Sequence, residues 1–406
     1  MLELQTLSPK LISALTPAAT EGLEALFNDL NSLPFVKILQ DSTSLVSEAE
    51  RMLESVSWAE HLVTVGIGGS DLGGRAIQMA LDHGRSDMEV IFFGESTDPA
   101  ALDDLLSRID LESTVFNFVS KSGGTVETMA QYFYLTQLLR DHTDDWKKHV
   151  VVTTDPTEGL LRKEVNEHNL QNLVIPTDLG GRFSVLSQVG IFSAAAMGVD
   201  VRELMFGAQR VQQETTDLRL KSVAAEIALW QYNLYEKGIE AAVMWTYGHR
   251  LTEFGRWWRQ LWAESLGKQN LGILPIAARG PADQHSQLQY YTQGRLQTGF
   301  TFLTLEESPS QHIIEKVSIP EFDYLRGEDF AHILKVEADA TAQSLVEAGK
   351  HVQKLTLSHL DAEGLGELFM TYELGVVILG KLFEINPFDQ PGVEDSKRKI
   401  KESLSA

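Results

Sequence analysis

The stretch SKSGGT combines residue types that could hold an anion. Ser120, Ser122 and Thr125 supply hydroxyl groups, while Gly123 and Gly124 let backbone N–H groups turn toward a bound oxygen without interference from a Cβ atom. The stretch lies between the apolar run STVFNFV and the helix-like run VETMAQYFYLTQLLR, where a strand end meets a helix start. This composition suits a phosphate group, although a serine or threonine helix cap after an ordinary turn would explain the same residues.

A second glycine-rich stretch, GIGGSDLGG, begins at Gly66 and carries the hydroxyl of Ser70. It also follows an apolar run, HLVTV, at a predicted strand end. Neither stretch is a nucleotide-binding motif. The chain has no G-x-x-x-x-G-K-S/T loop, and Asp71 stands where the third glycine of a dinucleotide fingerprint would be. These patterns therefore disfavour ATP and NAD.

The helix-like segment TEFGRWWRQLWAESLGK carries a candidate base. Gln260 and Glu264 are four residues apart on the segment, and Gly267 is a candidate helix stop. A carboxylate here could act as a general base, although a solvated glutamate at a helix end is the commoner arrangement. The large apolar residues of the segment fall on one stripe at about 100° per residue, which predicts a buried face rather than a cofactor site. They are Phe254, Trp257, Trp258, Leu261 and Trp262.

Further polar groups stand out, and none of them decides a function alone. Arg182 follows two glycines in DLGGRFS, where a guanidinium could approach a ligand or simply bridge a loop to a carboxylate. His285 lies between turn residues in GPADQHSQ, which is an unusual place for a buried histidine. Gln390, Glu394 and Lys397 come together in FDQPGVEDSK, near the end of the sequence.

The composition narrows the possible functions. The chain has 406 residues, no cysteine and a net charge of -23. The lack of thiols excludes disulfides, thiolate catalysis and cysteine-ligated metal sites, and the acidity disfavours nucleic acid as a partner. The sequence does not open like a secretory signal, and its best apolar stretch, residues 189–199, is well short of the roughly 20 residues of a membrane helix. We therefore expect a cytoplasmic protein.

Strand-like and helix-like runs alternate along most of the chain, which predicts an α/β fold with doubly wound parallel sheets. The first series of strand candidates is HLVTVGIGG, MEVIFFGE, STVFNFVSKS, HVVVTTD and NLVIP, and the second is IEAAVMWTYG, LGILPIAARG, TGFTFLTLEE and HVQKLTLSHL.

The two series predict two α/β domains of similar build, at residues 60–200 and 201–383. Residues 1–59 lack strand patterns and are expected to form a helical arm with breaks at Pro17 and Pro34. No linker rich in Pro, Ser or Gly separates the domains, so we expect them to pack closely. Residues 384–406 are a C-terminal tail whose prolines preclude one continuous helix.

Six motifs in a fixed order resemble the phosphoglucose isomerase family. They are GIGGSDLGG, SKSGGTVET, GGRFS, ESLGK, DQHSQ and NPFDQPGVEDSK, and the resemblance runs from about residue 60 to residue 400. The motifs DLGGRFS and FDQPGVEDSK are highly specific to that family. One departure is Gly124, which stands where many relatives have threonine and removes one hydroxyl near the loop.

The resemblance implies an aldose-ketose isomerase that interconverts glucose 6-phosphate and fructose 6-phosphate. It also implies two sugar isomerase domains of flavodoxin-like strand order, with no metal and no cofactor. By motif match, Ser120, Ser122, Thr125 and the backbone around Lys121 would hold the substrate phosphate, with Ser70 beside them.

The remaining motif matches assign the chemistry. Glu264 would move a proton between C1 and C2 through a cis-enediol, and Arg182 would stabilise the charge on that intermediate. His285 and Lys397 would open the sugar ring. Gln260 and Gln390 would position the sugar. In the family the histidine comes from the neighbouring subunit, which implies a homodimer.

Two rival readings stay open at this point. A non-catalytic sugar-phosphate-binding regulator on the same domains would keep the phosphate loop but would not need Glu264, Arg182, His285 and Lys397 together. The same chemistry could also act on mannose 6-phosphate or an amino sugar phosphate, but for the amino sugar we expect a glutaminase domain with a nucleophilic cysteine, and the chain has none.

Overall fold

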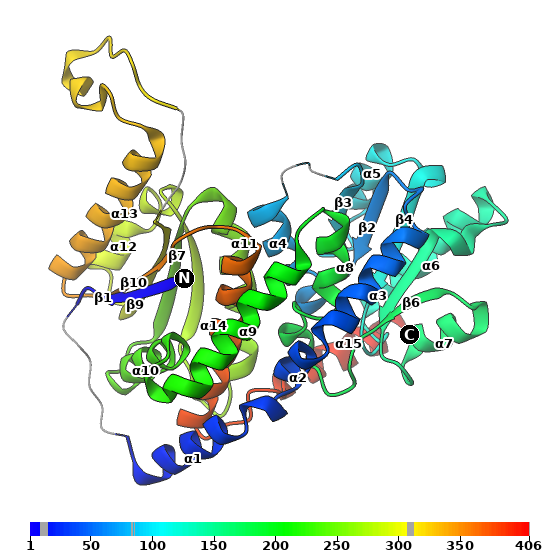
Figure 1. Ribbon diagram of the computed structural model, residues 1–406, viewed down its shortest axis with the longest axis horizontal. Coiled ribbons are helices and arrows are strands. Elements are labelled where there is room, and N and C mark those ends of the chain that lie inside the picture. The colour runs from blue at the N-terminus through cyan, green and yellow to red at the C-terminus, as the bar shows by residue number, and fades with distance from the viewer. Residues whose placement is uncertain (9–14, 83, 85, 307–311, 406) are drawn as a thin grey trace.

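The computed structural model describes residues 1–8, 15–82, 84, 86–306 and 312–405, and contains two five-stranded sheets (Figure 1). The first sheet consists of β2 (His61–Val65), β3 (Glu89–Phe93), β4 (Thr114–Val119), β5 (Val150–Thr154) and β6 (Gln171–Val174). The second consists of β1 (Leu2–Thr6), β7 (Ala241–Tyr247), β8 (Leu274–Gly280), β9 (Thr298–Leu305) and β10 (His351–Leu357).

The two sheets repeat one strand order. The first runs β3-β2-β4-β5-β6 with all strands parallel, which is the flavodoxin-like order. In the second, the parallel strands run β8-β7-β9-β10, which is the same order over four positions. The predicted α/β class with doubly wound parallel sheets is therefore confirmed.

The fifth position of the second sheet is taken by β1, which pairs antiparallel with β10. The prediction of a purely helical segment over residues 1–59 is wrong here. Leu2 and Leu4 are half-buried against the core, while Glu3 and Gln5 are exposed on the other face. This alternation extends over only five residues, which is a weak signal for a strand. The strand is stabilised by pairing with the otherwise open edge of β10, which is distant in sequence.

The helices cover both faces of each sheet (Figure 1). Pro17 and Pro34 each occupy the first turn of a helix, where a missing N–H costs nothing, so they start helices rather than break them. The helices are α1 (Pro17–Asn28), α2 (Pro34–Gln40), α3 (Ser42–Ser55), α4 (Leu72–Leu81), α5 (Pro99–Arg108), α6 (Val126–His142), α7 (Leu160–His168), α8 (Gln188–Ala196), α9 (Val201–Leu218), α10 (Val223–Glu236), α11 (Thr252–Leu266), α12 (Leu288–Gln293), α13 (Phe330–Glu347), α14 (Ala362–Leu382) and α15 (Glu394–Leu404). Within the described residues, no helix is both long enough and apolar enough to cross a membrane.

One hydrophobic core joins the two sheets. The faces that the sheets turn toward each other contribute Leu62 and Val115 from the first and Met244 and Leu355 from the second, and all four belong to the same buried cluster. Helices α4, α8, α9, α10, α11 and α14 supply more than half of its other side chains. The two units therefore pack closely, as the missing linker predicts. The exact boundaries at residues 60, 200 and 383 stay predictions.

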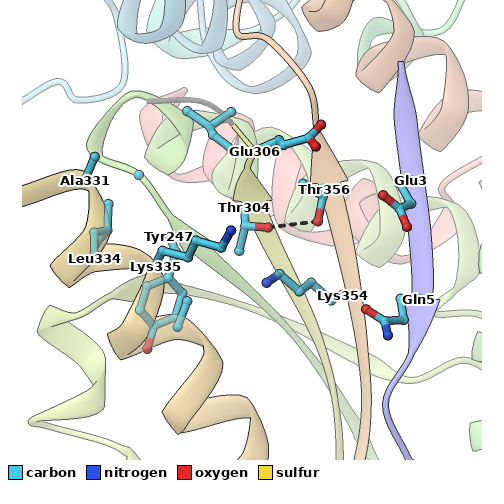
Figure 2. A pocket seen from close by; sticks show the side chains of 13 residues that line it. Glu3, Gln5, Tyr247, Thr304, Glu306, Ala331, Leu334, Lys335, Lys354 and Thr356 are labelled. Atoms are coloured by element: carbon cyan, nitrogen blue, oxygen red, sulfur yellow. Dashed lines mark hydrogen bonds between the residues drawn. The ribbon is translucent and has the colours of Figure 1, made fainter. Parts of the chain in front are cut away.

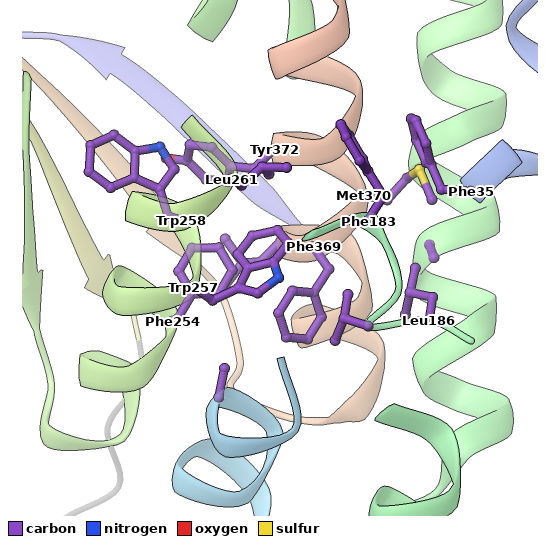
Figure 3. Packing of buried hydrophobic residues seen from close by; sticks show 14 of the residues in the cluster. Phe35, Phe183, Leu186, Phe254, Trp257, Trp258, Leu261, Phe369, Met370 and Tyr372 are labelled. Atoms are coloured by element: carbon purple, nitrogen blue, oxygen red, sulfur yellow. The ribbon is translucent and has the colours of Figure 1, made fainter. Parts of the chain in front are cut away.

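The aromatic stripe of α11 lies in this core, as predicted (Figure 3). Trp257 packs edge-on against Phe369 of α14, with ring centroids 4.8 Å apart, and Trp262 packs against Tyr372 at 5.4 Å. These contacts fix the rotation of α11 about its own axis. Gln260 and Glu264 are half-buried at the border of this stripe, so the same contacts fix their position.

The C-terminal tail (residues 384–406) is irregular around Pro387 and then forms helix α15 after Pro391. The prolines do prevent one continuous helix, as predicted. The helix itself was not expected, because EDSKRKIKESL has few apolar residues and none of them is buried. Ion pairs along its own surface accompany it, such as Arg398 with Glu402 at 2.7 Å.

Candidate active site

A cavity of about 660 Å³ lies at the carboxyl ends of β2, β4 and β5, between the first sheet, α11 and the C-terminal tail. This is the switch point of the first sheet, where β2 and β4 lead away to opposite sides. The cavity brings together every predicted site residue except His285. These are Ser70, Ser120, Lys121, Ser122, Thr125, Arg182, Gln260, Glu264, Gln390 and Lys397.

The SKSGGT loop presents hydroxyls and N–H groups at one end of the cavity. The Ser120 and Ser122 hydroxyls accept hydrogen bonds from the N–H groups of Gly123 and Gly124, each at 3.1 Å, which fixes the shape of the loop. Gly123 has φ +60°, and a Cβ there would lie 2.4 Å from the Leu161 nitrogen, so only glycine fits.

Two further features of this loop bear on its role. Thr125 is the residue before α6, yet its side chain forms no capping hydrogen bond, so its hydroxyl and the positive end of the 17-residue helix are available to an anion. Lys121 points elsewhere, because its ammonium donates to the carbonyls of Thr177 at 2.5 Å and Leu179 at 3.0 Å. Lys121 therefore offers the cavity its backbone, not its charge.

The first glycine loop is pressed against the segment that carries Arg182. A Cβ on Gly69 would lie 2.2 Å from the carbonyl carbon of Gly181, and the Ser184 hydroxyl donates to the Gly69 carbonyl at 3.3 Å. Asp71, directly after Ser70, is buried, and burial raises its pKa to about 6 although Arg75 opposes this. Close backbone contact thus places Ser70 next to Arg182 in the same cavity.

Arg182 is buried, and all of its guanidinium nitrogens are hydrogen-bonded. Nε donates to the Ser265 hydroxyl at 2.7 Å. Nη1 donates to Gln390 Oε1 at 2.9 Å and to Glu264 Oε2 at 3.3 Å. Nη2 donates to two backbone carbonyls of the tail. Burial lowers the pKa of the guanidinium, whereas Glu264 and Asp389 act to raise it, and arginine stays charged in proteins.

The Glu264 carboxylate is held at both oxygens. Oε1 accepts from the Gln260 amide at 3.0 Å, and Oε2 accepts from Arg182. Its side chain is 30% exposed, against 3% for Arg182, so the carboxylate faces the cavity while the cation lies behind it. Gly267 caps α11 as predicted, which places Glu264 in the last turn. A fixed, partly exposed carboxylate next to a buried positive charge is suited to proton transfer.

Comparisons with known proteins give the family of this chain. A model of the family described as phosphoglucose isomerase matches residues 38–273. A probable glucose-6-phosphate isomerase of Methanococcus maripaludis is 36% identical over 91% of this chain and 84% of its own. A glucose-6-phosphate isomerase of Rubrobacter xylanophilus is 37% identical over 84% of this chain and 81% of its own.

The chain belongs to the phosphoglucose isomerase family. Among solved structures, a hypothetical protein from Thermus thermophilus superposes with a TM-score of 0.88 at 32% identity, covering 96% of this chain and 95% of that one. The family membership and the shared fold therefore extend beyond the matched segment to nearly the whole chain.

Two residues that the family resemblance pairs for ring opening lie in different places. Lys397, on α15, lines the cavity, and its ammonium donates to Glu394 at 2.8 Å. His285 is exposed just after a short 3₁₀ turn (Ala282–Gln284) that follows β8, and it does not line the cavity. Within one chain, the cavity therefore holds the predicted lysine without the predicted histidine.

The loop after β5, which lies beside SKSGGT, was not predicted to be part of the site. Asp155, Glu158 and Gly159 line the cavity. Burial acts to raise the pKa of Asp155, but the N–H groups of Thr157 and Glu158 donate to its carboxylate and hold the pKa below its ordinary value. A usable signal was present, because DPTEG is a turn-rich stretch directly after the strand-like run VVVTT.

A smaller cavity of about 220 Å³ lies near the carboxyl ends of β7 and β9 in the second sheet (Figure 2). Its lining mixes both charges, with Glu3 and Glu306 as well as Lys335 and Lys354. None of the predicted site residues reaches it. Although the strand orders match, five of the six motifs converge on the switch point of the first sheet, and DQHSQ does not.

Substitution of Gly69 tests the close contact behind Arg182. We expect Gly69→Ala to lower kcat/KM at least about tenfold and to destabilise the fold by about 1–3 kcal/mol, because the new Cβ must push the Gly181 backbone away. Gly22→Ala in α1 is the matched control, since no atom of the described residues lies within 4 Å of its Cβ position. It should keep full activity and gain about 0.5–1 kcal/mol. Denaturant unfolding and steady-state kinetics measure both, and a Gly69→Ala variant as active as the control would contradict the contact.

Proposed function

We propose that the cavity at the first switch point carries out the reaction of the phosphoglucose isomerase family, which interconverts glucose 6-phosphate and fructose 6-phosphate. The chain has this activity as a member of that family. The proposal concerns which residues perform it. The observation that supports it most is the Glu264 carboxylate, held by Gln260 and Arg182 in the same cavity as the SKSGGT loop.

The substrate phosphate would bind the hydroxyls of Ser120, Ser122 and Thr125 and the free N–H groups at the start of α6, with Ser70 beside them. The cavity, at about 660 Å³, is of the size that proteins use for small molecules. A phosphate bound here fixes one end of the sugar, so that its C1 and C2 carbons come to a constant position relative to Glu264.

Glu264 then acts as the base. It takes the proton from C2 of the open-chain aldose and returns it to C1, while a second proton passes from O2 to O1, so the carbonyl moves from C1 to C2. Removal of the C2 proton leaves an enediolate, whose negative charge lies on its oxygens until a proton reaches O1 and completes the cis-enediol. Arg182 stabilises this charge, and because its guanidinium is already fixed by five partners, little reorganisation is needed as the charge develops.

Ring opening precedes these steps, and we assign it to Lys397 together with His285 of the partner subunit. The exposure of His285 outside its own cavity supports a site completed by a second copy. Segment 313–336 projects from the second sheet and is drawn in gold in Figure 1. Its exposed apolar side chains are a further support. They are Ile313, Ile319, Phe322, Tyr324, Phe330 and Val336. Such a surface suits an interface between protein chains.

A non-catalytic regulator is the weaker reading. Such a protein needs the phosphate loop, but it does not require a carboxylate held between Gln260 and Arg182.

The cytoplasmic location stays a prediction.

Replacement of Glu264 tests the catalytic assignment. Glu264→Gln should lower kcat by at least about 100-fold, because the amide cannot accept the C2 proton, while the affinity for a phosphorylated sugar acid stays nearly unchanged. A coupled assay of glucose 6-phosphate formed from fructose 6-phosphate measures the first, and calorimetry the second. Glu158→Gln, which neutralises another carboxylate of the cavity, should keep kcat within about tenfold. Near-normal turnover by Glu264→Gln would remove that residue from its role.

Mixing two inactive variants tests the shared site. When Glu264→Gln and His285→Ala chains are refolded together, the mixed dimer has one site with both native residues, so about a quarter of the wild-type activity should return. Glu264→Gln mixed with Arg182→Lys is the control. Both residues lie in the cavity of one chain, so that pair should recover nothing. If the first mixture also stays inactive, the site is not shared between subunits.

A further inference from the structure

Lys268 holds the C-terminal tail in place just outside the cavity. It is the residue after Gly267, at the end of the helix that carries Glu264. Its ammonium donates to the carbonyls of Asn386 at 2.5 Å and Asp389 at 2.6 Å, and to the Asp389 carboxylate at 2.5 Å. Its side chain is only 9% exposed. All three donors of the ammonium are therefore used on one short segment, residues 386–389.

The same segment is held from the other side by Arg182. The Asp389 carbonyl accepts from Lys268 and also from Arg182 Nη2, at 2.9 Å, and the Pro387 carbonyl accepts from the same nitrogen at 2.5 Å. Arg182 follows the first sheet, whereas Lys268 follows α11 of the second unit. Arg182 and Lys268, from two parts of the fold, thus both donate hydrogen bonds to the backbone immediately before Gln390.

The charge of Asp389 gives Lys268 a second role. Asp389 raises the pKa of Arg182, so its carboxylate lies close enough to attract that guanidinium. Lys268 pairs with this carboxylate directly. Without Lys268, Asp389 would compete with Glu264 and the developing enediolate for the positive charge of Arg182.

The tail also has an apolar anchor that does not depend on Lys268. Pro387 is buried against Gly380 of α14, where an added Cβ would lie 3.1 Å from the proline Cβ. The ring of Phe388 packs on Phe183 with centroids 5.1 Å apart. Loss of the ammonium should therefore leave residues 387 and 388 in place and loosen the residues that follow.

We propose that Lys268 is a positioning residue of the isomerase reaction. It fixes the tail backbone so that Gln390 stays on Arg182 and Lys397 stays at the cavity, and it neutralises Asp389 so that the charge of Arg182 faces the substrate. This rests on the roles given above to Arg182, Gln390 and Lys397. Lys268 itself does not line the cavity.

The test compares three substitutions at this position with one elsewhere. Lys268→Ala and Lys268→Met should lower kcat about 10- to 100-fold, the range expected when catalytic groups are displaced, with binding of a phosphorylated sugar acid within about threefold. Lys268→Met keeps most of the side-chain volume and guards against loss of folding. Lys268→Arg keeps the charge and should stay within about fivefold of wild type. Lys354→Ala is the matched control, since Lys354 also pairs with an aspartate at 2.5 Å but lies at the smaller cavity (Figure 2).

Chemical rescue separates positioning from mere stability. Propylammonium replaces the atoms that Lys268→Ala removes, so it should restore part of the kcat of that variant, whereas tetramethylammonium at equal concentration should not. Wild-type turnover by both Lys268→Ala and Lys268→Met would overturn the proposal, as would an equal loss in Lys268→Arg or a lack of rescue. Failure of the proposed function would look different, because Glu264→Gln would then turn over while Lys268 was still native.

Discussion

A buried guanidinium with no free donor is the interaction on which the site depends. Arg182 joins the loop after the first sheet to Ser265 and Glu264 of α11 and to residues 387–390 of the tail. A buried charge is stable only when it is paired and fully hydrogen-bonded. All three segments must therefore be in position before Arg182 can be buried without a large cost in free energy. The same bonds that satisfy the cation therefore assemble the cavity, and one of them is a direct ion pair with the partly exposed carboxylate of Glu264.

The surrounding fold limits how these segments can move. The aromatic contacts between α11 and α14 set the rotation of α11 about its axis. Close contacts at glycines of the first sheet's loops fix the distance between those loops and α11. The SKSGGT loop follows β4 of the first sheet, and Glu264 lies on α11 between β7 and β8 of the second, but one continuous core connects the two sheets. A sugar phosphate bound at the loop, as we propose, would therefore meet a carboxylate whose position is determined by packing, which is what efficient proton transfer at a fixed carbon requires.

Much of this could be predicted from the sequence, because the relevant signals are local. Strand–helix alternation gives the sheets, the spacing of Phe254 to Trp262 gives the buried face of α11, and Gly267 marks its end. What could not be predicted depends on distant partners. The strand β1 is stable only beside β10. Lys268 donates hydrogen bonds to backbone carbonyls more than 100 residues further along the chain. The part that we propose for His285 would need a second chain, which no local pattern encodes.

The most direct measurement is a crystal structure of this chain with a phosphorylated sugar acid bound. The phosphate should lie within hydrogen-bonding distance of the Ser120, Ser122 and Thr125 hydroxyls, and a Glu264 carboxylate oxygen should lie beside the C1 and C2 positions, with the five partners of Arg182 unchanged. A phosphate bound in another cavity, or a Glu264 side chain turned away from the sugar, would contradict the assignment of this site.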